Sequence, residues 1–150
     1  MAAETPGPVL LAYDGSDLAA FAIERAGREL APGREAVVVC VWHPADVGFT
    51  PVDGEHLHAA AADEVETAAL RTARRGAELA DAAGFRAHGV AVNASPTWRG
   101  LVDAAREHGA TLIVFGAHRR SGILGHLAGS VTAATTAHFD GAVLVVHRPG

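Results

Sequence analysis

The chain has 150 residues and a mass of 15.4 kDa, a size typical of one domain whose core needs neither disulfides nor metals. Apolar residues make up 49% of it, charged residues 19%, and the formal net charge is -5, which excludes a disordered acidic chain. The pI of about 5.9 and the lack of a dense basic patch argue against a nucleic-acid partner.

The chain also lacks the apolar stretches of a membrane protein. No run approaches the roughly 20 apolar residues that cross a bilayer, and residues 1–8 have no signal-peptide pattern. The one cysteine, Cys40, lies in a valine run and is expected to be a small buried side chain. We therefore expect a cytoplasmic protein that binds no membrane.

Short β-branched runs alternate with longer alanine-rich stretches, a pattern typical of repeated βαβ units. Five strands are predicted, at residues 8–13, 36–42, 85–93, 111–115 and 142–147. Four helices are predicted, from the 14–16 turn to about residue 31, from about 55 to 83, from 96 to 109, and from 130 to about 138. These elements predict a single α/β domain over residues 1–150, an open five-stranded parallel sheet of order 3-2-1-4-5 with helices on both faces.

The patterns within the elements indicate where each one lies. The run 36–42 is apolar throughout, which favours a central strand, whereas the alternation in 85–93 favours an edge. Ser95 and Pro96 are expected to be the N-cap and first residue of the third helix. The predicted apolar face of the second helix consists of Leu57, Ala61, Val65, Ala68, Thr72, Leu79 and Ala83.

An open parallel sheet binds ligands beyond the carboxyl ends of its strands, where the strand order reverses, so the residues after the first and fourth strands are the candidates. Asp14-Gly15-Ser16 places a carboxylate beside a helix N-terminus, where it can accept a hydrogen bond from a ribose hydroxyl or help to hold a metal. The alternative is that Asp14 or Ser16 only caps the helix.

The second candidate lies in the predicted connection 116–129, which is rich in glycine. Gly116-Ala117-His118-Arg119 is followed, after nine residues, by Gly129-Ser130-Val131 at the start of the fourth helix. Glycines let a backbone approach phosphate oxygens, and the helix N-terminus is a ready anion site. The alternative is an ordinary loop.

Several other motifs are missing or weak. There is no G-x-x-x-x-G-K-[ST], no G-x-G-x-x-G after the first strand, no G-x-S-x-G, and no lysine anywhere in the chain. His56 and His58 follow a long loop, 43–54, but residues two apart on a helix face different directions, so a metal site there is disfavoured and none is predicted.

Four segments together resemble the universal stress protein family, and the resemblance spans nearly the whole chain. They are Val9 to Ser16, Leu112 to Gly116, Gly129-Ser130-Val131, and Val143 to Val146. The family's ATP-binding pattern is Gly, two residues, Gly, nine residues, then Gly and Ser or Thr. Gly116, Gly129 and Ser130 match this pattern with its spacing intact, whereas Arg119 replaces the second glycine.

The resemblance implies an adenine nucleotide, ATP with Mg²⁺ or Mn²⁺, bound with adenine near Val41, ribose near Asp14 and Gly116, and phosphates over Gly129-Ser130-Val131. The expected binding residues are Asp14, Gly15, Val41, Gly116, His118, Arg119, Gly129, Ser130 and Val131. The expected role is a stress-response regulator that binds ATP without turning it over.

The resemblance also implies a homodimer formed through strand 142–147, whose open edge is available to another chain. A further protein partner is expected to recognise the surface that this dimer presents. Two rival functions stay open. One is a slow ATP hydrolase in which Asp14 holds the cation, and the other is a structural dimer in which Arg119 prevents nucleotide binding.

Overall fold

The computed structural model describes residues 6–43, 55–118 and 130–149. Their five strands form one sheet of order β3-β2-β1-β4-β5, and each neighbouring pair is parallel, as the sequence predicts. The strands are β1 (Val9–Ala12), β2 (Glu35–Trp42), β3 (Arg86–Asn93), β4 (Leu112–His118) and β5 (Ala142–Arg148). The helices are α1 (Asp17–Glu29), α2 (Glu55–Ala82), α3 (Thr97–His108) and α5 (Ser130–His138).

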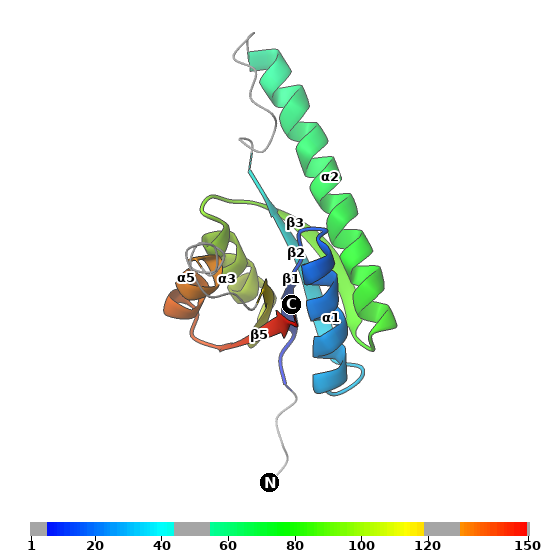
Figure 1. Ribbon diagram of the computed structural model, residues 1–150. Helices are drawn as coiled ribbons and strands as arrows, with labels where there is room; N and C mark the ends of the chain where they lie inside the picture. Colours follow the sequence, from blue (N-terminus) through cyan, green and yellow to red (C-terminus); the bar gives the residue numbers. More distant parts are fainter. Residues whose placement is uncertain (1–5, 44–54, 119–129, 150) are drawn as a thin grey trace.

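The helices cover both faces of the sheet (Figure 1), with α1 and α2 on one face and α3 and α5 on the other. Successive side chains of a strand point to opposite faces, so β1 serves two cores. Val9 and Leu11 pack with α1 and α2, whereas Leu10 packs with α3, and all three are fully buried. The strand that precedes the candidate site is therefore enclosed on both faces.

Helix α1 begins and ends where its sequence directs. The Ser16 hydroxyl accepts a hydrogen bond from the Ala19 N–H at 3.1 Å, which satisfies one of the free donors of the first turn. The helix ends at Glu29, and the turn that follows contains Gly33 with a φ of +82°. Ala22, Ile23 and Ala26 form its buried face toward the sheet.

Helix α2 matches its predicted face only in part. Val65 and Ala83 pack against the core, whereas the side chains of Leu57 and Ala61 lie outside the described residues. Leu79, which was expected inside, is 40% exposed, and Ala68 is exposed as well. The residues that do contact the sheet are smaller: Ala69, Ala73, Gly76, Ala77 and Ala80. In a helix so rich in alanine, few bulky side chains mark the buried face, and the close approach of helix and sheet selects the small ones instead.

Two glycines show how close that approach is. A Cβ atom on Gly76 would lie 2.6 Å from Val38 Cγ1, and one on Gly89 of β3 would lie 2.5 Å from the backbone of Ala73. Real Cβ atoms almost never come this close to other heavy atoms. The packing of α2 on β2 and β3 therefore requires glycine at both positions.

The start of α3 corrects one prediction. The helix begins at Thr97, and its N-cap is Pro96, in extended conformation and without a capping side chain, instead of Ser95. The cap falls one residue later than expected because Pro96 adopts a ψ of 163°, outside the helical region. The predicted end is confirmed, since Gly109 adopts a left-handed conformation with a φ of +69°.

The edges of the sheet are the predicted ones. β3 pairs only with β2, and β5 only with β4, within the described part of the chain. None of the described helices is both long and apolar enough to cross a membrane.

Replacing Gly89 with Ala tests the close packing of α2. The added methyl group meets helix backbone, which has little room to move, so we expect a loss of about 1–3 kcal/mol in the free energy of unfolding. Urea unfolding measures this, with Asn93→Ala at the exposed end of the same strand as the control, expected within about 0.5 kcal/mol of the unchanged protein. Equal stability of the Gly89 variant and this control would contradict the close approach.

Candidate functional site

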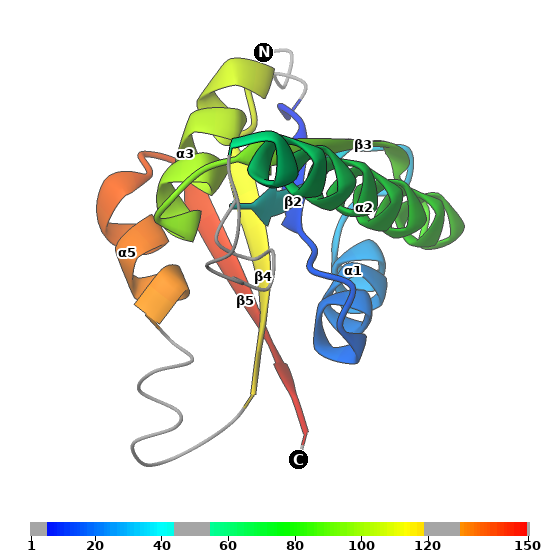
Figure 2. The ribbon, with the colours of Figure 1, turned by 90° about the horizontal axis from the view of Figure 1, so that it is seen from above.

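A cleft of about 210 Å³ lies at the carboxyl ends of β1 and β4. The strand order reverses between these two strands, as the sequence analysis expects of a ligand site. Figure 2 shows α1 on one side of this point and α3 and α5 on the other. Residues from three helices and three strands thus contribute to one wall.

Asp14 lies at the mouth of the cleft, in the turn between β1 and α1. Its Oδ1 accepts a hydrogen bond from the Ser16 N–H at 2.9 Å, and the carboxylate is exposed to solvent. Gly15 has a φ of +86° and shapes this turn without forming part of the cleft wall. Ser16 therefore caps helix α1. The second carboxylate oxygen of Asp14 has no hydrogen bond to the described residues.

The interior of the cleft is an apolar slot. Val39 and Val41 of β2 form part of it, Leu101 of α3 and Phe115 of β4 form another part, and Val41 is only half-buried. Asp14 is the one charged side chain among the described residues of the wall. A slot of this composition accepts a flat, largely apolar group, while the carboxylate at its mouth accepts hydrogen bonds from hydroxyl donors.

Gly116 lines the cleft, but it lies in a strand and not in the predicted loop. β4 continues to His118, and Gly116 pairs with Val146 of β5. A Cβ atom on Gly116 would lie 2.8 Å from the Leu18 carbonyl oxygen, so glycine is needed here for the contact with α1. The prediction ended β4 at residue 115 because a glycine in the sequence is commonly a sign that a turn begins.

The first turn of α5 completes the lining of the cleft. Val131 and Thr132 line the cleft, and the N–H groups of a first helical turn have no partners within the helix. They and the positive end of the helix dipole are suited to an anion. Arg119 and Gly129 lie outside the described residues, as do the side chains of His118 and Ser130.

Contacts with α3 hold α5 in this position. Trp98 stacks on His138 with ring centroids 4.0 Å apart, and Arg106 donates a hydrogen bond to the His138 carbonyl oxygen at 3.2 Å. Within α5, the buried Thr135 hydroxyl donates to the Val131 carbonyl oxygen at 2.7 Å. The two contacts to His138 hold the carboxyl end of this short helix against α3, while Val131 near its start packs against the hydrophobic core.

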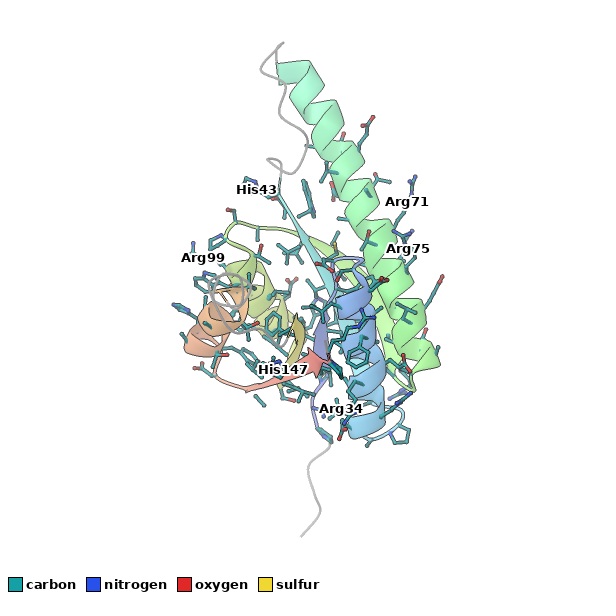
Figure 3. The ribbon with its side chains drawn as sticks, viewed as in Figure 1. Arg34, His43, Arg71, Arg75, Arg99 and His147 are labelled. Carbon is teal, nitrogen blue, oxygen red and sulfur yellow. The ribbon has the colours of Figure 1, made fainter. Side chains whose placement is uncertain are left out.

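The cleft continues into a second hollow of about 560 Å³. Val41, Thr97 and Val131 line both spaces, and Trp42, His43 and Trp98 line only the second. Figure 3 shows His43 at the end of β2 and Arg99 on α3.

Sequence reasoning missed the contribution of two helices to the site. Leu18 of α1 and Thr97 of α3 both line the cleft, although neither directly follows β1 or β4. A signal for Thr97 was present, because the Ser95-Pro96 start of α3 lies at the carboxyl end of β3, at the same edge of the sheet. The identity of the two facing helices becomes clear only once the strand order is known.

Comparisons with known proteins agree with this architecture. A family model described as the universal stress protein family matches residues 7–147. A universal stress protein solved in complex with cAMP is 25% identical, with a TM-score of 0.65 over 96% of this chain and 98% of that one. A family protein from Burkholderia pseudomallei is also 25% identical, with a TM-score of 0.63 over 93% and 95% of the chains.

A more distant structure shows the same fold. The universal stress protein from Archaeoglobus fulgidus, solved in complex with dAMP, is 20% identical, with a TM-score of 0.55 over 95% of this chain and 98% of that one. The comparison with curated proteins finds no significant match. With its family match over nearly the whole length, its strand order and the cleft at the reversal point, the chain belongs to the universal stress protein family.

Proposed function

We propose that the cleft binds an adenine nucleotide, specifically ATP with Mg²⁺ or Mn²⁺. One observation carries the proposal: the cleft joins an apolar slot, an exposed carboxylate and a helix N-terminus within a single wall. These three features match the three chemical parts of a nucleotide, namely a flat base, a sugar with hydroxyl groups and a chain of phosphates.

Each part of the wall has a definite task in this proposal. The base occupies the slot beside Val41 and Leu101, where apolar contact replaces water. A ribose hydroxyl donates a hydrogen bond to Asp14, which the Ser16 N–H holds in place. The phosphates lie toward Val131 and the first turn of α5.

Related structures support an adenine nucleotide as the ligand. Two of the related structures were solved with cAMP and dAMP, and both of these ligands contain adenine. The spacing of Gly116, Gly129 and Ser130 supports the choice of ATP, because the family's ATP-binding pattern has the same spacing. Mg²⁺ or Mn²⁺ would neutralise phosphate charge, with Asp14 as the carboxylate suited to help hold it.

We further propose that the protein binds ATP without hydrolysing it and acts as a dimeric regulator in the stress response, in the cytoplasm. The sequence contains no lysine to clamp phosphates, and its only cysteine, Cys40, is buried, which suits a reducing compartment. Dimerisation would use β5, whose second edge has no neighbouring strand among the described residues and whose Val145 is only half-buried. The dimer would present its surface to a protein partner.

Adding ATP and Mg²⁺ should stabilise the folded protein. At 100 times its Kd, a ligand adds about 2.7 kcal/mol of stability, which for a chain of this length raises the Tm by roughly 5–11 °C. A thermal-unfolding titration with ATP, and with GTP for comparison, measures this effect, while phosphate release is followed in the same samples. A flat response at millimolar ATP would contradict nucleotide binding, and sustained phosphate release that Asp14→Ala abolishes would favour the hydrolase.

Two variants and one control variant make this titration more specific. Asp14→Ala should weaken ATP binding by roughly 10- to 100-fold, because it removes a hydrogen bond to a charged group. The control is Asp103→Ala, on the exposed side of α3, which should leave the affinity for ATP unchanged. Arg119→Gly distinguishes ATP binding by the natural sequence from the rival function, a structural dimer in which Arg119 prevents nucleotide binding. If Arg119 closes the site, only this variant will respond to ATP.

Sedimentation velocity tests the dimer. We expect a particle of twice the 15.4 kDa chain mass, and Val145→Lys should convert it to a monomer because charge on an edge strand opposes pairing. Ala137→Lys, at an exposed position of α5, is the matched control and should stay dimeric. An unchanged protein that sediments as a monomer would contradict the proposal.

A further inference from the structure

A third hollow, of about 500 Å³, lies at the opposite end of the sheet from the cleft. Its wall contains Pro8, Glu35 and Arg86, which precede or begin β1, β2 and β3, and His108, which ends α3. Since the strands are parallel, their amino ends meet at this edge, and the nucleotide proposed above would bind at the other edge. The hollow is therefore a separate place on the molecule.

Two imidazole rings face each other across this hollow. His88 of β3 is exposed, His108 of α3 is half-buried, and their ring centroids are 5.7 Å apart with a tilt of 57°. Two imidazoles bound to one tetrahedral zinc ion, with Zn–N bonds of 2.0–2.1 Å, have centroids about 5.2 Å apart. The two rings therefore need to approach by only about half an ångström to share one ion.

Glu35 lines the same hollow as the two histidines and is the candidate for a third donor. It lies on the same face of the sheet as His88, because Glu35 and Val37 alternate to the same side of β2 and Val37 pairs with His88. Its present partner is Arg86, at 3.7 Å, and both side chains are more than 60% exposed. An exposed ion pair of this kind contributes little to stability, so Glu35 can exchange Arg86 for a cation.

The other carboxylate in the wall already has a structural task. Asp81 Oδ1 accepts a hydrogen bond from the Ala87 N–H at 2.9 Å, which ties the end of α2 to β3. Among the described residues, no group of three or more His, Cys, Asp or Glu side chains is arranged to hold a metal ion as they now lie. A site here must therefore close on its ion through the side chains of His88, His108 and Glu35.

We propose that this hollow binds a divalent transition-metal ion, with His88 and His108 as nitrogen ligands, Glu35 as an oxygen ligand, and water completing the shell. Imidazole nitrogens select zinc-like ions over Mg²⁺ and Ca²⁺, which prefer oxygen. The ion would join the last turn of α3 to the edge strand β3 and to β2. It would thereby stabilise the end of the fold that the nucleotide does not reach.

Calorimetric titration of the metal-free protein with Zn²⁺ tests this assignment. His88→Gln and His108→Gln should each weaken binding at this site at least about tenfold, because the loss of even a residue that only supports a metal ligand costs that much. His147→Gln, an exposed histidine on β5, is the matched control and should bind as the unchanged protein does. Equal binding by all four proteins, or none by the unchanged protein, would overturn the proposal.

Two further measurements distinguish loss of metal binding from loss of folding. Urea unfolding without metal shows whether each variant folds, and Zn²⁺ should raise the Tm of the unchanged protein but not that of the His88 and His108 variants. Glu35→Gln should also weaken binding, and unchanged affinity would overturn its assignment as a ligand. Asp103→Ala, an exposed carboxylate of α3 outside both the cleft and this hollow, should bind Zn²⁺ normally, and because no nucleotide is present, a failure of the nucleotide proposal leaves this test intact.

Discussion

The position of β1 in the middle of the sheet is the constraint on which the candidate site depends. Both of its edges pair with parallel strands, and both of its faces are covered by helices, so its backbone and side chains are fixed. The chain leaves β1 toward β2 and returns to its other side with β4. Helices α1 and α3 consequently lie on opposite faces, and the space between their first turns opens above the end of β1.

The same geometry divides the chemistry among elements that are far apart in the sequence. Asp14 is held by the turn that caps α1, the apolar slot is formed by strand ends and α3, and the helix N-terminus comes from α5. The stack of Trp98 on His138 links the last two elements, at 4.0 Å between ring centroids. A ligand that uses all three parts therefore meets described groups that already surround one cleft, which lowers the entropic cost of binding.

Much of this architecture could be predicted from the sequence, because strong local signals specify it. The alternation of β-branched and alanine-rich runs indicated the strands and their parallel arrangement. The patterns within residues 36–42 and 85–93 indicated a central and an edge strand, and Ser16 and Gly109 marked the ends of helices. The predictions failed where small residues allow close packing between elements that are far apart in the sequence. Leu79 was placed inside and Gly116 in a loop, since the sequence does not show that α2 and α1 approach the sheet so closely. The same limit hid Thr97, which joins the site only through the arrangement of α3 over the sheet.

The most direct test of the central claim is a set of ¹H–¹⁵N NMR spectra recorded during titration with ATP and Mg²⁺. The amide signals of Ser16, Gly116 and Val131 should shift together and saturate at one concentration, because these residues surround the cleft. The signals of His88 and His108, at the other end of the sheet, should stay in place. Unchanged signals around the cleft, or shifts confined to the opposite end, would contradict a nucleotide site at the carboxyl ends of β1 and β4.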